Sequence, residues 1–296
     1  MSPAGASRAW ASAARPKTLL AAVGPVLIGG GLAWSDGWFS TLPFVIALAC
    51  ALLIQIGTNF ANDYSDFVRG ADTEDRLGMP RATQTGLITP SRMRLGAILT
   101  FSLAIVLGLY LVWVGGWPIL AIGLLSIAAG VAYTGGPWPF GYHGLGDLFV
   151  FLFFGPVAVA GTYYVQALRW GAPATLLVGA AIGALTTAIL VVNNLRDAET
   201  DARAGKRTLA VRLGRGGTRV EFTLLLAIGV VVPLLGVTSL GWSPWRLLAL
   251  GGLVAVAGSL REVWRFSDPR ALNDALEGTA RAAGLYGLLF AVGCVL

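Results

Sequence analysis

The sequence predicts an all-α protein that crosses a membrane several times as a single bundle of helices around a central cavity. One supporting observation is composition: 56% of the 296 residues are hydrophobic and 12% are charged, whereas soluble domains carry about a quarter charged residues. A second is that apolar stretches of bilayer-spanning length recur along the whole chain. We therefore expect an integral membrane protein.

Nine apolar stretches approach the roughly 20 residues that an α-helix needs to cross a bilayer. The first follows the basic residues Arg8, Arg15 and Lys17 and lacks a small-residue cleavage site, so we expect an uncleaved first helix. The stretches at 117–133 and 281–296 are the shortest. The expected helices span about 18–35, 42–61, 95–114, 117–133, 147–166, 174–194, 220–240, 244–260 and 281–296.

The basic residues indicate how these helices are oriented. If the N-terminus is cytoplasmic, only Arg169 and Arg246 of the 21 Lys and Arg residues fall on the outer side. Positive charge concentrates on the cytoplasmic side of membrane proteins, and an error of one helix in mid-chain would scramble this separation. We therefore expect a cytoplasmic N-terminus and both Asp-rich segments on the cytoplasmic side. Nucleic-acid binding is not expected, because the basic residues lie between apolar segments rather than on a soluble face.

One domain is expected over residues 1–296. It would consist of a short basic segment at 1–17, the nine helices, and cytoplasmic active-site loops at about 62–94, 134–146 and 195–219. The two cysteines fall inside apolar stretches, so a disulfide framework is not expected.

Polar side chains recur every three or four residues toward the end of the second apolar stretch. Residues at this spacing share one face of a helix. An Asp facing lipid at mid-helix would cost roughly 2.5–3.5 kcal/mol, so this stripe should face the interior of the bundle. The stripe consists of Gln55, Asn59, Asn62, Asp63 and Asp66.

A second stripe, Asn193, Asp197 and Asp201, has strict four-residue spacing at the end of the sixth stretch. An offset of four helices preserves orientation, so this weak parallel repeat would place both stripes on one side of the membrane, facing each other. The alternative is that these acids are helix-terminal residues paired with neighbouring arginines such as Arg69 and Arg196.

Facing carboxylates repel one another unless cations lie between them. Oxygen ligands without clusters of His or Cys favour Mg²⁺, which takes one or two carboxylates together with substrate phosphates, so a diphosphate would suit this site. Basic residues could neutralise the diphosphate or could serve only as orientation signals. The basic candidates are Arg15, Lys17, Arg69, Arg81, Lys206 and Arg207.

A loop rich in Gly and Pro runs from Tyr133 to Asp147 on the same side and contains the only histidine, His143. His143 could transfer a proton or serve as a hydrogen-bonded structural residue, and Asp147 could bind substrate or cap the next helix. Aromatic residues beyond the loop, such as Phe153, could line a hydrophobic tunnel and stabilise a carbocation, although packing against lipid explains many such residues.

These segments resemble the UbiA-type family of intramembrane prenyltransferases. The two signatures of that family, Asn-Asp-x-x-Asp with a further Asp downstream and Asp-x-x-x-Asp after an Asn-rich helix end, occur here at 62–66 and 197–201 in matching order. Longer strings are similar to the branch that acts on 1,4-dihydroxy-2-naphthoate in menaquinone synthesis. These strings are Ala14-Arg15-Pro16-Lys17-Thr18-Leu19, Arg69-Gly70-Ala71-Asp72, Gly141-Tyr142-His143-Gly144-Leu145-Gly146-Asp147 and Gly205-Lys206-Arg207-Thr208-Leu209.

The resemblance implies transfer of a polyprenyl group from polyprenyl diphosphate to 1,4-dihydroxy-2-naphthoate, with loss of CO₂ and diphosphate, giving demethylmenaquinone. It also implies a cavity that opens laterally to membrane lipid and holds Mg²⁺-diphosphate between the two Asp motifs. The sequence departs from the family at one point, because some relatives carry a Lys where this chain has Gly141. The missing charge could come from Arg15, Lys17 or Lys206.

The candidate site residues follow from these patterns and from the resemblance. Those expected to bind metal are Asn62, Asp66, Asn193, Asp197 and Asp201. Those expected to act in the reaction are Asp66, Asp72, Asp197, Asp201 and His143. Those expected to bind substrate are Arg15, Lys17, Asn59, Asp63, Arg69, Tyr133, Tyr142, Asp147, Arg196, Lys206 and Arg207.

Three other interpretations are open. A UbiA-type enzyme could act on another aromatic acceptor, such as 4-hydroxybenzoate. An ion-coupled transporter could also use intramembrane acids, but here the acids lie at helix ends and the repeat is not inverted. Alcohol phosphatidyltransferases use Asp-rich membrane motifs too, but their Asp-Gly-x-x-Ala-Arg arrangement is not found at either Asp-rich segment.

Overall fold

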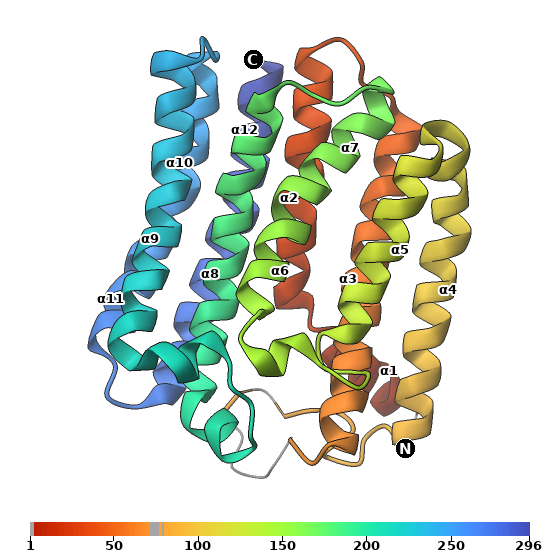
Figure 1. Cartoon of the computed structure of the whole chain (residues 1–296), viewed down its shortest axis with the longest axis vertical. Coiled ribbons are helices and arrows are strands. Elements are labelled where there is room, and N and C mark those ends of the chain that lie inside the picture. The colour runs from red at the N-terminus through yellow and green to blue at the C-terminus, as the bar shows by residue number, and fades with distance from the viewer. Residues whose placement is uncertain (1–2, 72–76, 79) are drawn as a thin grey trace.

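The chain folds into one bundle whose helices run up and down roughly along a common axis, with the N- and C-termini at opposite ends (Figure 1). The computed structural model describes residues 3–71, 77–78 and 80–296, and over these ranges it contains helices and connecting segments but no strand. The predicted all-α fold class is therefore confirmed. Asp72 lies outside the described residues.

Eight helices or helical runs in the described ranges are long and apolar enough to cross a membrane, as an integral membrane protein requires. The expected helix near 117–133 forms as α5 (Trp117–Ala132), but its 16 residues fall short of the usual length for a crossing. Five of the eight are single helices: α2 (Pro16–Ser35), α3 (Thr41–Val68), α4 (Pro90–Gly115), α8 (Pro173–Arg203) and α9 (Leu209–Ser239). The other three are runs of consecutive short elements. The first run joins α6 (Gly146–Leu152), η2 (Phe153–Val157) and α7 (Ala158–Ala167); the second joins η3 (Pro244–Leu248), α10 (Ala249–Gly252), η4 (Leu253–Val256) and α11 (Ala257–Arg265); the third joins η5 (Pro269–Ala271) and α12 (Leu272–Val295).

Helices α3 and α8 continue beyond the apolar stretches that predicted them. The stretches end near 61 and 194, whereas the helices end at Val68 and Arg203. Because a helix satisfies its backbone hydrogen bonds internally, it can continue into polar sequence outside the lipid. Asp66, Asp197 and Asp201 therefore lie on helices, as their spacing indicated, and the loops expected to begin near 62 and 195 begin only after Val68 and Arg203.

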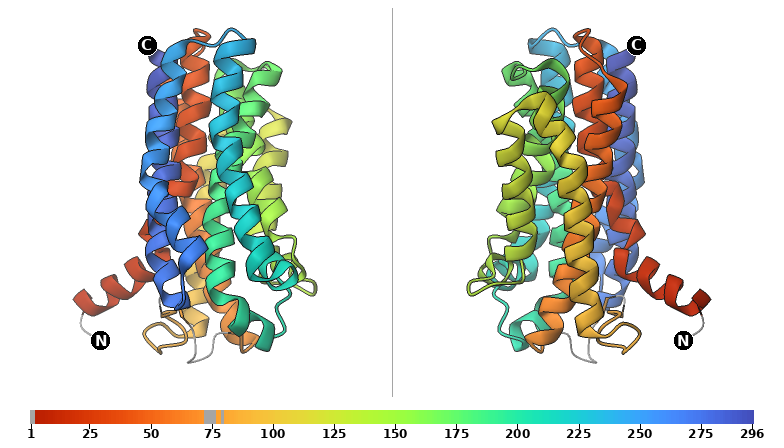
Figure 2. Two further views of the ribbon diagram at one scale, coloured as in Figure 1. Left: turned by 90° about the vertical axis from the view of Figure 1, so that its left-hand side faces the viewer. Right: turned by 90° about the vertical axis from the view of Figure 1, so that its right-hand side faces the viewer.

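A short helix, α1 (Pro3–Ala14), precedes the first span and leaves the bundle at an angle (Figure 2). It is anchored by Trp10, whose ring meets that of Phe60 edge-on at 5.2 Å between centroids. Arg15 joins α1 to α2 in a left-handed backbone conformation with φ 52°, which is uncommon for a residue other than glycine. The resulting change of direction leaves Arg15 in the wall of the central cavity.

Helix α8 lies at the centre of the bundle and packs against α2, α9, α12 and η2. The contact with η2 depends on glycine, because a Cβ atom at Gly155 would lie 2.5 Å from the Gly179 carbonyl oxygen and 2.8 Å from the Gly183 Cα. Small residues let membrane helices approach this closely. The η2 segment is a π-helical bulge, and it carries Phe153 and Phe154 into the cavity wall.

We predict that Gly183→Ala destabilises the bundle. The new Cβ would lie 2.6 Å from the Phe151 carbonyl oxygen, so backbone must move, at a cost of about 1–3 kcal/mol. Gly258→Ala is the control, since Gly258 is also in a helix but no atom lies within 4 Å of its added Cβ. Thermal unfolding in detergent, followed by circular dichroism, should give a lower midpoint for Gly183→Ala. Equal midpoints for the two variants would contradict this account of the contact.

Candidate active site

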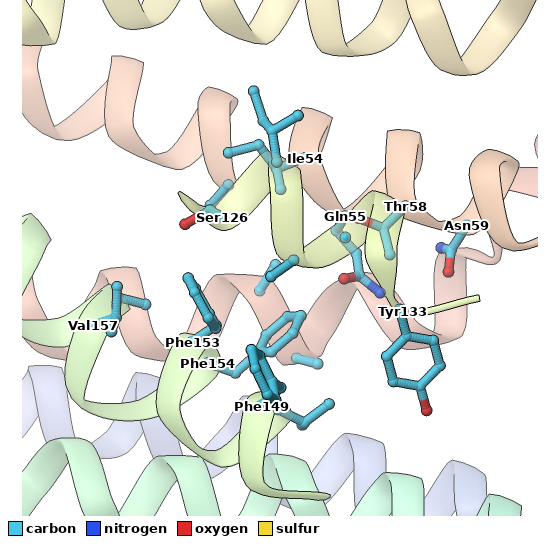
Figure 3. A pocket seen from close by; sticks show the side chains of 18 of the residues that line it. Ile54, Gln55, Thr58, Asn59, Ser126, Tyr133, Phe149, Phe153, Phe154 and Val157 are labelled. Carbon is cyan, nitrogen blue, oxygen red and sulfur yellow. The ribbon is translucent and has the colours of Figure 1, made fainter. Parts of the chain in front are cut away.

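A cavity of about 430 Å³ lies inside the bundle, and it is lined mostly by residues between α2 and α8, with Lys206, Thr208 and Leu276 from later in the chain. One end is polar and contains the ends of both Asp-rich helices, whereas the remainder is mostly apolar. Figure 3 shows the transition: Gln55, Thr58 and Asn59 follow one another along α3, with the rings of Phe149 and Phe153 across the cavity from them. Every member of the two polar stripes except Asp63 therefore lines one cavity.

Asp66 lies at the polar end with only 1% of its surface exposed. Arg81 Nη2 lies 2.7 Å from Asp66 Oδ2, the Tyr142 hydroxyl donates to Oδ1 at 2.8 Å, and Lys206 Nζ lies 3.3 Å from Oδ1. An isolated buried carboxylate would cost several kcal/mol, so these partners allow the charge to remain inside the bundle. The contacts bring together four segments that are far apart in the sequence.

Asp197, on α8, is paired with its neighbour Arg196. Arg196 donates from Nε to Asp197 Oδ1 at 2.8 Å and from Nη2 to Oδ2 at 2.7 Å, a two-point contact that suits a planar guanidinium. Arg196 also donates to the side-chain oxygens of Asn193 at 2.9 Å and Asn273 at 2.8 Å. The alternative in which an Asp pairs with a neighbouring arginine thus holds for Asp197, yet Asp197 and Asn193 still line the cavity.

Lys206 returns to the cavity through the turn that ends α8. Gly205 adopts φ 77°, and the Lys206 amide donates to the Asp201 carbonyl oxygen at 2.8 Å, an arrangement typical of helix C-termini. The Lys206 Nζ lies 3.3 Å from Asp66 Oδ1, 4.0 Å from Asp201 Oδ1 and 4.8 Å from the centroid of the Tyr142 ring. One cation therefore links the two Asp motifs.

The loop after α5 covers this end of the cavity. Tyr142 lies in its short helix η1 (Phe140–His143). Arg69 Nε donates to the Thr134 carbonyl oxygen at 3.0 Å, Arg69 Nη2 donates to the Gly136 carbonyl, and the guanidinium lies 5.8 Å from the centroid of the Tyr142 ring. Arg69 thus attaches the loop to the end of α3, and it pairs with carbonyl groups rather than with the Asp we considered as its partner.

Gly141 has no room for a side chain. A Cβ atom at this position would lie 2.7 Å from the Tyr133 carbonyl oxygen, to which the Gly141 amide donates at 2.9 Å. The backbone conformation of this chain therefore excludes the lysine that some relatives carry here. Arg15, Arg81 and Lys206 instead bring positive charge to the cavity wall.

Asp63 faces the segment before α4 rather than the cavity. Its carboxylate is 2% exposed and accepts hydrogen bonds from the amides of Ala82 and Thr83, both at 3.2 Å. Successive helix residues point about 100° apart, which is why Asn62 and Asp66 reach the cavity and Asp63 does not. The substrate-binding role of Asp63 stays a prediction, and its visible role is to hold a loop.

His143 also lies outside the cavity wall. Its ring stacks on Trp138 at 4.5 Å between centroids, and its Nδ1 lies 2.9 Å from the Pro139 carbonyl oxygen. The His143 carbonyl accepts a hydrogen bond from Arg212 at 2.8 Å. These contacts favour a structural role for His143 over a role in proton transfer.

Other predicted residues surround the cavity without lining it. Lys17 pairs with Glu277 at the surface, and the Arg207 side chain is exposed. Asp147 is buried in the first turn of α6 rather than at the cap position before it, and its Oδ2 has no hydrogen-bond partner among the described residues. The roles of these residues and of Asp72 stay predictions.

The oxygen-bearing side chains of both motifs fit a metal that arrives with a diphosphate. Asp66, Asp197 and Asp201 line one cavity together with Asn62 and Asn193. Among the described residues, no three acidic, His or Cys side chains are grouped closely enough to hold a metal ion by themselves. Mg²⁺ commonly takes only one or two carboxylates and completes its shell with phosphate oxygens and water, so this donor set suits it.

Aromatic rings form one side of the cavity beyond the polar end. Phe140 stacks on Phe149 at 4.0 Å between centroids, Phe149 and Phe153 lie nearly parallel at 6.2 Å, and Tyr133 meets Phe140 edge-on at 5.5 Å. The Tyr133 side chain also lines the cavity, and its phenol can donate a hydrogen bond there.

The sequence did not single out every residue of the wall. Arg81 was one of six basic candidates, and nothing in its local pattern distinguished it from the others. Thr58 and Ser126 are small polar residues in apolar helices, and both line the cavity (Figure 3). The one feature of the sequence that could have identified them is their polarity, because a residue that faces lipid at these positions would be apolar.

Comparisons with known proteins identify the family of the chain. The model of the UbiA prenyltransferase family matches residues 22–277. The chain is 41% identical over 297 residues to 1,4-dihydroxy-2-naphthoate octaprenyltransferase of Escherichia coli (strain K12), covering 98% of this chain and 96% of that protein. It is 44% identical over 257 residues to the protein of the same name from Mycobacterium tuberculosis, covering 85% of this chain and 86% of that protein.

Solved structures share the fold. A UbiA homolog from Aeropyrum pernix K1 matches with a TM-score of 0.70 at 14% identity, covering 91% of this chain and 97% of that one. A UbiA homolog from Archaeoglobus fulgidus bound to DMAPP and Mg²⁺ matches with a TM-score of 0.62 at 18% identity, covering 94% and 98%. The family model matches residues 22–277 of this chain, and two relatives are 41% and 44% identical to it. The chain therefore belongs to the UbiA prenyltransferase family, as its motifs indicated.

Proposed function

We propose that this protein transfers a polyprenyl group from polyprenyl diphosphate to 1,4-dihydroxy-2-naphthoate, with loss of diphosphate and CO₂. The product is the reduced form of demethylmenaquinone, an intermediate of menaquinone synthesis. One observation carries the proposal: both Asp motifs and an aromatic wall share a single cavity, in a chain that is 41% identical over almost its whole length to a naphthoate octaprenyltransferase.

The polar end would bind the diphosphate. Asp66, Asp197 and Asp201, with the amide oxygens of Asn62 and Asn193, would hold Mg²⁺, which when bound neutralises the charge that develops on the departing diphosphate. The carboxylates now paired with Arg81, Lys206 and Arg196 would exchange these partners for the metal. The released guanidinium and ammonium groups would then be free to donate to phosphate oxygens.

The aromatic wall would receive the prenyl group. Breaking the carbon–oxygen bond to diphosphate leaves positive charge on the allylic carbons, and the ring faces of Phe149 and Phe153 provide negative potential there without a nucleophile. The apolar lining also excludes water, which would otherwise capture the cation.

The acceptor would lie between these two ends. Its ring carbon that bears the carboxylate forms the new bond to the prenyl carbon, and the electron pair of the carbon–carboxylate bond returns to the ring as CO₂ leaves. Because CO₂ rather than a proton departs, no strong base is required. The position of His143 outside the cavity wall is consistent with this chemistry.

Gln55 is the residue best placed to recognise the acceptor. It lines the cavity on α3 between the polar end and the aromatic wall (Figure 3). Its amide has no hydrogen-bond partner among the described residues, so both its N–H groups and its oxygen are available to the carboxylate and hydroxyl groups of dihydroxynaphthoate.

We also propose that the polar end faces the cytoplasm of a bacterial cell, with the chain in the cytoplasmic membrane. The loops at this end carry most of the Lys and Arg residues, which supports this orientation.

Replacing Asp66 or Asp197 by Asn should lower Mg²⁺-dependent release of diphosphate by about 100-fold or more, because each change removes a charge that stabilises the transition state. Glu199→Gln is the matched control, since Glu199 is exposed on α8 and does not line the cavity. Circular dichroism would separate lost activity from lost fold. Unaltered turnover in both Asp variants would remove the metal-site assignment.

Replacing Gln55 by Ala should raise the KM for dihydroxynaphthoate about tenfold while changing the KM for polyprenyl diphosphate much less, because a hydrogen bond to a charged group is lost. Gln55→Glu should raise the KM for dihydroxynaphthoate further, because the new carboxylate would repel the carboxylate of the acceptor. Ser126→Ala, a polar change elsewhere in the same cavity, is the control. The measurement is steady-state kinetics with each substrate varied in turn, repeated with 4-hydroxybenzoate as a second acceptor. Equal increases in the KM values for dihydroxynaphthoate and for polyprenyl diphosphate would reject the assignment of Gln55 to the acceptor.

A further inference from the structure

Two arginines on α9, outside the active site, lie against the aromatic end of α11. The guanidinium carbon of Arg215 is 4.5 Å from the centroid of the Phe266 ring, and that of Arg219 is 5.2 Å from the same ring and 5.9 Å from the ring of Trp264. Arg219 Nε also donates to the Val263 carbonyl oxygen at 2.9 Å. The two positive charges are therefore held beside one ring instead of moving freely in solvent.

Neither guanidinium forms an ion pair with an acidic side chain of the described residues. Within the part of the chain that the structure describes, no carboxylate oxygen lies within 4.0 Å of Arg215 or Arg219. The Asp268 carboxylate nearby in sequence accepts instead from the Arg270 amide at 2.9 Å. Two like charges held together without a counter-charge create a strong attraction for an anion.

The stacking leaves hydrogen-bond donors available. A guanidinium contacts an aromatic ring through its face, while its N–H groups point outward in its plane. Arg215 makes no side-chain hydrogen bond among the described residues and is exposed, whereas Arg219 uses Nε and keeps both terminal nitrogens. A planar fork of this kind matches the oxygen atoms of a phosphate group.

The surroundings belong to the membrane–water boundary. Trp264 is 45% exposed, and its indole Nε1 donates to Thr223 Oγ1 at 3.1 Å. Tryptophan is enriched at this boundary because one side of the ring is apolar and the other polar. Further along α9, Val220 and Leu224 are 49% and 60% exposed, which suits contact with lipid tails. The lower ends of α9 and α11 lie at the same end of the bundle as the N-terminus (Figure 1).

We propose that Arg215, Arg219 and Trp264 form a binding site for the phosphate group of an anionic phospholipid at the membrane boundary. The charge of the pair selects an anionic headgroup over a zwitterionic one, and the exposed ring of Trp264 beside Arg219 selects a lipid over a soluble phosphate. This site lies outside the catalytic cavity and does not depend on the proposed function.

The test is native mass spectrometry of the purified full chain in detergent with equal amounts of phosphatidylglycerol and phosphatidylcholine. Wild type should retain phosphatidylglycerol preferentially. The double variant Arg215→Gln/Arg219→Gln should bind phosphatidylglycerol about 25-fold more weakly, since each basic residue near an anionic surface contributes about fivefold. The variant Arg215→Lys/Arg219→Lys keeps the charge and loses the planar fork. Its affinity for phosphatidylglycerol should lie between those of wild type and the Gln double variant.

Arg92→Gln/Arg94→Gln is the matched control. These two exposed arginines begin α4 and make no aromatic or acidic contact among the described residues, so the same net charge is removed without touching the site. Diphosphate release and helical content should be unchanged in every variant. If the double variant fails to fold, the single Arg215→Gln change should still weaken binding about fivefold.

Three outcomes would overturn the proposal. The first is equal retention of phosphatidylglycerol by wild type and the double variant. The second is an equal loss in the Arg92 and Arg94 control, which would indicate a general charge effect. The third is displacement of phosphatidylglycerol by millimolar inorganic phosphate alone, which would identify a site for soluble phosphate instead of lipid.

Discussion

The charge of Asp66 inside an apolar bundle is the constraint on which the rest of the site depends. A carboxylate that is 1% exposed is tolerable only if cations and hydroxyl donors replace the water it has lost. Arg81, Tyr142 and Lys206 provide these contacts from three different segments. The contacts that allow this carboxylate to stay buried are therefore the same contacts that bring the candidate active-site residues together.

This arrangement also explains how so much charge can be concentrated at one end of the cavity. Each Asp is matched by a nearby Arg or Lys, as with Arg196 and Asp197, so the local net charge stays small while the individual charges stay available. A metal-diphosphate brings both signs of charge and can replace these internal pairs without leaving an unpaired group. The apolar remainder of the cavity would have the opposite task, which is to keep water from a reactive carbon.

Neighbouring residues of one motif have different tasks because of helix geometry. Asn62 and Asp66 face the cavity, whereas Asp63 holds the amides of Ala82 and Thr83. That contact fixes the segment that carries Arg81, so Asp63 acts indirectly on the partner of Asp66. The motif thus combines groups positioned toward substrate with a group that positions the adjacent loop.

The sequence by itself determined the fold class, the approximate helices, the two acidic stripes and the family. These depend on local properties, since bilayer thickness sets the length of an apolar stretch and the 3.6-residue period sets which side chains share a face. The helix ends were placed too early at 61 and 194 because hydropathy marks where the apolar sequence ends, while α3 and α8 continue into polar sequence.

Only the tertiary structure decided which of these residues meet. Arg81 and Tyr142 contact Asp66 across 15 and 76 positions of sequence, and no local pattern encodes such contacts. Neither could the sequence distinguish the cavity face of Asp66 from the loop face of Asp63, or the stacked Arg215 from other basic residues. These outcomes depend on how helices pack around α8, and packing is a property of the whole chain rather than of any one segment.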